Sequence, residues 1–234
     1  MPIHLHREIE RLKKQILSLC AFVEDGLHQA VKSVIDRDPE LARKVIESDI
    51  QVDHAEIDVE EECLKILALH QPVAIDLRYI IACLKMNNDL ERIGDLAVNI
   101  AKRAIFISKG SAFQVPYDLM GLGEKTQAMF RASLDALVNM DAKAAKDVCV
   151  LDDEIDDLNR DALRKTEEMI RKHPEHLESL VALISVSRAL ERIADHATNI
   201  AEDVVYMSEG RIARHGREFS EEGKPGQAGT DASK

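Results

Sequence analysis

Apolar side chains recur with a helical period along most of this chain. Between Tyr79 and Ala104 they recur every three or four residues, which is the spacing of one face of an α-helix. The same period runs through the other long stretches that lack proline and glycine. Aromatic residues make up only 3% of the chain and Trp is absent, so the composition argues against a β-sandwich. The pattern predicts an all-α protein.

Proline, glycine and capping aspartates mark where the helices begin and end. Proline is tolerated in the first turn of a helix but not in its interior, so Asp38 followed by Pro39 indicates a helix start. Asp141 can cap a later helix in the same way, and Gly110 and Gly210 each follow a long periodic stretch, as helix-ending glycines do. We therefore predict six helices, at about 4–36, 39–70, 73–109, 117–139, 142–172 and 175–209.

The chain contains an internal repeat. The segment LERIGDLAVNIA at 90–101 returns as LERIADHATNIA at 190–201, with nine of the twelve positions identical. Upstream, residues 38–53 align with residues 141–156. Two copies of one three-helix unit follow from this match. We predict two tandem, pseudo-symmetric three-helix bundles at 1–112 and 113–210, because long helices with short loops pack antiparallel. The glycine-rich remainder, 211–234, is predicted to be a disordered tail.

Each copy carries acidic residues at helical spacing on its second and third helices. Positions four apart drift by only ~40° around a helix, so each set lies on one face. The residues of the first copy are Asp49, Asp53, Glu91, Asp95 and Asn99. Those of the second copy are Asp152, Asp156, Glu191, Asp195 and Asn199. We call the four carboxylates of each copy the first cluster and the second cluster.

The predicted turns bring the members of each cluster to one level. In an antiparallel pair, facing residues are centred on the turn. Asp49 with Asp95, and Asp53 with Glu91, are both centred on Pro72, where the sequence already predicts a turn. The corresponding pairs of the second cluster are centred on the His173–Pro174 junction, the predicted turn between its two helices. Four carboxylates are therefore expected side by side in each copy.

Clustered carboxylates repel one another unless they bind protons or cations. Oxygen ligands suit hard cations, so we expect divalent or trivalent metal ions as cofactors: iron, manganese, magnesium or zinc. A solvated acidic face is the alternative, as it is for most charge runs, but two clusters in register favour metal binding. A ferritin-like di-iron site requires Glu-x-x-His, and no histidine here has a glutamate three residues before it. Arg92 and Arg192 are expected to form surface ion pairs.

Other functional classes are disfavoured by charge and by missing motifs. The chain has 31 basic and 43 acidic residues, a net charge of −12, which opposes nucleic-acid binding. It has no apolar run of about 18 residues and no signal peptide, so we expect a cytoplasmic protein without a transmembrane segment. A glycine-rich phosphate loop, GxSxG and HExxH are all absent, which argues against an enzyme.

The two repeated segments, together with PVAIDLRYIIACLKMNNDLERIGD before the first, resemble the PhoU family over roughly residues 3–210. The resemblance implies two three-helix bundles, often in a homodimer, with metal ions held at both clusters and at Asn99 and Asn199. It also implies a regulatory adaptor that links the ATPase subunit of the phosphate ABC transporter to the phosphate sensor histidine kinase. Such an adaptor represses the phosphate-starvation response and reaches the membrane through its partners. A metal-dependent enzyme or metal buffer using the same carboxylates is the alternative.

Overall fold

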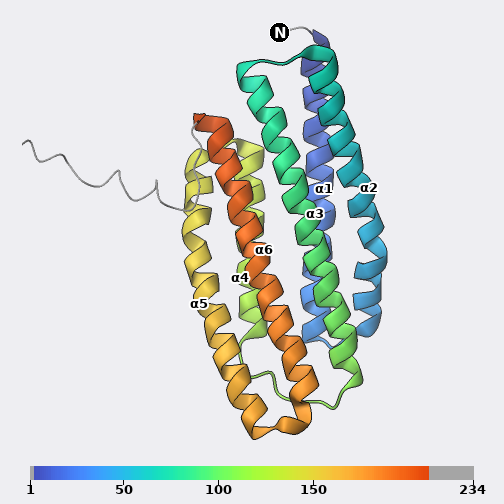
Figure 1. The fold of residues 1–234 in the computed structure, drawn as a ribbon, viewed down its shortest axis with the longest axis vertical. Helices are drawn as coiled ribbons and strands as arrows, with labels where there is room; N and C mark the ends of the chain where they lie inside the picture. Colours follow the sequence, from blue (N-terminus) through green and yellow to red (C-terminus); the bar gives the residue numbers. More distant parts are fainter. Residues whose placement is uncertain (1–2, 211–234) are drawn as a thin grey trace, which may run out of the picture.

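A computed structural model describes residues 3–210 as a set of long helices lying side by side (Figure 1). The elements are α1 (Ile3–Ile35), α2 (Pro39–His70), α3 (Ala74–Lys109), α4 (Leu119–Asn139), α5 (Ala142–Lys172), the short 3₁₀ helix η1 (Pro174–His176) and α6 (Leu177–Glu209). No strand occurs between residues 3 and 210, which confirms the predicted all-α class. The predicted helix ends agree within two residues, and the predicted tail at 211–234 lies outside the described residues.

The capping residues act as predicted. Asp38 accepts hydrogen bonds from the backbone amides of Glu40 and Leu41, at 2.9 and 3.0 Å, and so closes the open amino end of α2. Asp141 does the same for α5. Gly210 ends α6 with a φ of 72°, a left-handed conformation that glycine adopts without strain.

The helices form two three-helix units that meet along two helix pairs. Helices α1, α2 and α3 pack on one another, as do α4, α5 and α6. The units are joined where α3 packs on α6 and α1 packs on α4. Helices α2 and α5 lie at opposite edges of the molecule (Figure 1), and neither packs on the other unit. Within residues 3–210, the outer faces of α2 and α5 are therefore not covered by another helix.

The repeat extends to the packing of individual side chains. With a shift of 103 residues, the buried positions of α2 become those of α5. In α2 they include Ala42, Val45, Val52, Val59 and Cys63. In α5 they are Ala145, Val148, Ile155, Ala162 and Thr166. Equivalent residues therefore occupy equivalent places, and differences between the copies can be compared position by position.

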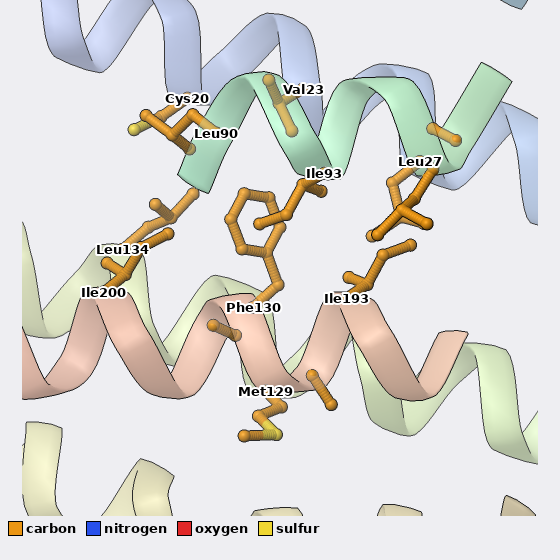
Figure 2. Packing of buried hydrophobic residues seen from close by; sticks show 14 of the residues in the cluster. Cys20, Val23, Leu27, Leu90, Ile93, Met129, Phe130, Leu134, Ile193 and Ile200 are labelled. Carbon is orange, nitrogen blue, oxygen red and sulfur yellow. The ribbon is translucent and has the colours of Figure 1, made fainter. Parts of the chain in front are cut away.

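The two units share one hydrophobic core. Buried side chains from all six α-helices belong to a single cluster. Figure 2 shows part of it, with Leu27 of α1, Ile93 of α3, Phe130 of α4 and Ile193 of α6, each fully buried. Because the helices are amphipathic and present charged faces outward, none between residues 3 and 210 is both long and apolar enough to cross a membrane.

Candidate metal centre

The antiparallel register predicted for α2 and α3 is confirmed by two contacts. The side-chain amide of Asn87 donates to the backbone oxygen of Glu56 at 3.0 Å and to its carboxylate at 3.1 Å. At Gly94 the helices approach so closely that a Cβ there would lie 3.1 Å from Val52 Cγ1 and 3.6 Å from Asp49 Oδ1. Asp49 therefore sits against α3 between the two acidic residues that this helix contributes to the first cluster.

Asp49 is the carboxylate most affected by this crowding. Several causes together raise its pKa to about 6, and the largest of them is partial burial, because a charge is poorly solvated there. Asp53 and Asp95 also raise the pKa of Asp49 through charge repulsion, with a smaller contribution from Glu91. Lys102 acts in the opposite direction. The first cluster is thus close enough for its members to influence one another's ionisation.

Glu91 responds to the same neighbours and to an arginine. Burial raises the pKa of Glu91, and Asp95 raises it further, whereas Arg92 lowers it. The Arg92 guanidinium lies 3.4 Å from a carboxylate oxygen of Glu91 and 3.4 Å from one of Asp95. The expected surface ion pairing of Arg92 is confirmed, and it neutralises part of the first cluster.

Glu56 belongs to this acidic group, although the sequence analysis did not single it out. It raises the pKa of Glu91, and burial together with Glu60 and Asp53 raises its own pKa. Glu56 lies three residues after Asp53, so helical spacing alone could have placed it on the same face. Asn159 stands at the equivalent position of the second copy and carries no charge.

The second copy has the same register between α5 and α6. The Ser187 hydroxyl donates to the side-chain oxygen of Asn159. These two residues are the counterparts of Asn87 and Glu56, so one cross-helix polar contact occurs at the same level in both units. The second cluster is therefore placed as the first one is.

Asp152 is the counterpart of Asp49 and behaves in the same way. Its burial, together with repulsion from Asp195 and Asp156, raises its pKa to about 6. Asp153 and Glu191 contribute smaller increases. Asp153 is a carboxylate with no acidic counterpart in the first copy, where Ile50 occupies the equivalent position.

The two α6 carboxylates of the second cluster are also shifted upward. Burial raises the pKa of Glu191, followed by repulsion from Asp195 and Asp156. Burial and Asp156 raise the pKa of Asp195, while His196 and Arg192 lower it. Asp156, His196 and Arg192 all belong to the helix pair that forms this cluster.

The two asparagines of the predicted site occupy different surroundings. Asn199 donates its side-chain amide to Asp89 Oδ1 at 3.2 Å, so it reaches across to α3. His196 donates to the same oxygen at 2.7 Å. Both asparagines are exposed, but Asp89, whose carboxylate Asn199 reaches, is only 8% exposed. The structure thus ties Asn199 to the seam between the units, and the role of both asparagines as metal ligands stays a prediction.

The donor set fits a hard cation better than a zinc ion. Both clusters offer carboxylate oxygens, and no cysteine or histidine belongs to either set. Between residues 3 and 210, no three His, Cys, Asp or Glu side chains converge closely enough to enclose a metal ion. A bound cation therefore requires the exposed Asp53 and Asp95 to turn towards the partly buried Asp49 and Glu91. The raised pKa values of Asp49 and Glu91 indicate that their ionised forms are unfavourable, and a bound cation would reduce this cost.

Comparison with known proteins gives a consistent family match. The PhoU domain matches residues 16–104 and again residues 119–204, one match in each unit. The chain is 34% identical to the phosphate-specific transport system accessory protein PhoU homolog 1 of Thermotoga maritima over 98% of both chains. It is 38% identical to the PhoU homolog of Pseudomonas aeruginosa, over 89% of this chain and 86% of that protein.

Two solved structures share the fold. The crystal structure of PhoU from Pseudomonas aeruginosa superimposes with a TM-score of 0.85 at 37% identity, covering 88% of this chain and 99% of that one. The phosphate transport system regulatory protein PhoU from Streptococcus pneumoniae gives a TM-score of 0.80 at 25% identity, covering 90% and 100%. Both matches span the two three-helix units together.

Proposed function

Because this chain belongs to the PhoU family, we propose that it is the regulatory accessory protein of a phosphate-specific transport system. The observation that carries the proposal is the family match in both units, which covers most of the helical residues. The names of the similar proteins, a transport system accessory protein and a transport system regulatory protein, point to the same role.

In this proposal the protein acts on the cytoplasmic side of the membrane as an adaptor, as a homodimer and without nucleic acid. It contacts the ATPase subunit of the phosphate transporter and the phosphate sensor histidine kinase, and it keeps the starvation response off when phosphate is ample. The long, charged helix faces and the free outer faces of α2 and α5 supply the surface that an adaptor needs.

Metal binding is the second part of the proposal. Asp49 and Glu91 would hold a cation in the first cluster, and Asp152 and Glu191 would do so in the second. When bound, the cation supplies positive charge that offsets the cost of ionising these partly buried carboxylates. The exposed Asp95, on the same face of α3 as Glu91, would complete the first ligand set. The exposed Asp195, on the same face of α6 as Glu191, would complete the second.

A deletion strain tests the regulatory role. In a strain with no second copy of the gene, loss of the protein should leave a phosphate-responsive reporter switched on in rich phosphate. Expression of the intact chain from a plasmid should restore repression. Normal repression in the deletion strain would show that the regulatory role is wrong.

A metal-dependent enzyme is the second candidate. Partly buried carboxylates with raised pKa values, such as Asp49 and Asp152, are typical of general acids and bases. An adaptor should co-purify with the transporter ATPase or the kinase and turn over nothing. Metal-dependent hydrolysis that disappears in Glu91→Gln with Asp95→Asn would favour the enzyme instead.

A further inference from the structure

Helix α2 carries a straight line of exposed apolar side chains on its outer face. Ile50, Ile57 and Leu64 are 58%, 50% and 53% exposed. Their spacing of seven residues, close to two helical turns, keeps them in one line. The buried residues Val52 and Val59 follow Ile50 and Ile57 by two positions, which places them ~200° around the helix from the exposed line. The line, which we call the α2 stripe, therefore points away from the core of its own unit.

The second unit shows that the fold does not require this stripe. With the shift of 103 residues that superimposes the buried positions, the α2 stripe corresponds to Asp153, Arg160 and Glu167 of α5. All three are exposed, as a solvated helix face normally is. The same position in the same supersecondary unit is thus charged in one copy and aliphatic in the other. Packing among residues 3–210 does not explain the difference.

The α2 stripe is bordered by acidic residues. Exposed carboxylates flank it on both sides: Glu47, Asp53, Asp58, Glu60 and Glu61. Helix α2 has three lysines and arginines: Arg43 is paired with Glu40, Lys65 is paired with Glu8 and Glu62, and Lys44 is exposed near the start of the helix. The face therefore combines an apolar line with a negative border.

A cavity of about 310 Å³ opens beside the stripe, between α1 and α2. Its lining includes Phe22, which is 39% exposed, and the polar side chains of His54 and Asp58. Gln15 also lines it, and its side-chain oxygen is buried without a hydrogen-bond partner among residues 3–210. An unsatisfied buried acceptor is costly, so a donor from outside would stabilise this groove.

We propose that the outer face of α2 docks an amphipathic helix of a protein partner, with an aliphatic seam flanked by lysine or arginine. An apolar line about 21 Å long matches four turns of such a helix. The basic flanks would meet the acidic border, and a donor of the partner would reach Gln15 in the groove. A second copy of this chain fits poorly, because two acidic α2 faces repel each other.

A synthetic peptide can test this surface directly. The probe is a fluorescent 18-residue peptide with leucines along one helical face and lysines on both sides of them. Its controls are a scrambled peptide of the same composition and a peptide with glutamates in place of the lysines. By fluorescence anisotropy, the lysine peptide should bind the intact protein at least tenfold more tightly than either control. Equal binding of all three peptides would overturn the proposal.

The second unit supplies the matched variants. Ile50→Asp, Ile57→Arg and Leu64→Glu together place the α5 residues on α2, where the equivalent positions of α5 already tolerate them. This triple variant should keep its melting temperature and lose at least tenfold in peptide affinity. Val150→Asp, which removes an apolar side chain of α5 that is 68% exposed, should leave binding unchanged.

Three further results would contradict the proposal. In the first, the triple variant binds the lysine peptide as tightly as the intact protein does. In the second, Val150→Asp weakens peptide binding as much as the triple variant does. Alternatively, sedimentation would show a dimer of the intact protein that the triple variant splits, and the stripe would then seat a second copy of this chain. If the triple variant fails to fold, the single change Ile57→Arg is read by the same criteria.

Discussion

The first and second clusters share a centre and differ at their edges. Asp49 and Asp152 occupy equivalent places, and burial with neighbouring acids raises the pKa of each to about 6. Lys102, which lowers the pKa of Asp49, is replaced by Glu202 in the second copy. Both copies crowd their carboxylates together, but the charged residues that surround the two clusters differ. The shared crowding is the better guide to a function that both clusters have in common.

The contact between α3 and α6, where the two units meet, differs in polarity between its two ends, and this difference is larger than the one between the clusters. At one end Asp89 of α3 accepts hydrogen bonds from His196 and Asn199 of α6. The counterparts of Asp89 and His196 in the other copy are Ala189 and Leu96, both buried and apolar. One end of the seam is therefore held by a polar network and the other by packing, so the pseudo-two-fold relation is broken there.

Breaking the polar end should have the largest effect on stability. Asp89→Ala removes a mostly buried carboxylate and leaves the His196 ring without its hydrogen-bond acceptor. We therefore expect the free energy of unfolding to fall by about 2 kcal/mol. Adding His196→Leu recreates the residue pair found at the apolar end and should recover part of that loss. Urea unfolding of the single and double variants measures both the loss of stability and its partial recovery. A single variant as stable as the intact protein would show that the network does not hold the seam.

The shared centre should make the metal-free protein less stable as pH rises. In the folded state Asp49 and Asp152 bind protons more tightly, with pKa values of about 6, than in the unfolded chain, where aspartate titrates near ~3.9. The folded state therefore holds more protons between about pH 4 and about pH 6, and its stability falls as pH rises through this window. Because both groups are partly exposed, we expect about 1 kcal/mol in total.

Urea unfolding with a chelator at several pH values measures this loss. Asp49→Asn combined with Asp152→Asn should flatten the dependence between about pH 4 and about pH 6. An identical pH profile for the double variant and the intact protein would show that the two aspartates are not the groups responsible.

The charged edge should produce the smallest effect. Lys102→Glu gives the first cluster the charge that the second copy carries, so it should tighten cation binding there by about 1 kcal/mol, roughly fivefold. Glu202→Lys should weaken the second cluster by a similar factor. Calorimetric titration with Mn²⁺ compares the two variants. Unchanged affinities would mean that these residues lie too far from the bound ion to matter.

Sequence reasoning succeeded where short-range rules apply. The helix ends followed from capping residues such as Asp38 and Asp141, and from prolines that cannot lie inside a helix. The register within each helix pair followed from the turn, because a short connection fixes which residues face each other. The fold class and the level of both clusters were therefore predictable.

Contacts between helices distant in the chain were not predictable in this way. Helices α3 and α6 meet without a connecting turn, so nothing in the local sequence pairs Asp89 with His196. The direction of Asn199 depends on the same packing. Side-chain rotamers are a further limit: the sequence places four carboxylates at one level but does not determine whether their oxygens converge.

The central claim, that the two units provide two independent cation sites, is tested most directly by counting bound metal. The intact protein, Glu91→Gln with Asp95→Asn, Glu191→Gln with Asp195→Asn, and the combination of all four changes are loaded with Mn²⁺ and measured by elemental analysis. The account predicts that each paired variant keeps half of the metal and the combined variant keeps none, while all four remain folded. Metal near zero in the intact protein, or a paired variant that loses all of it or none, would contradict the claim.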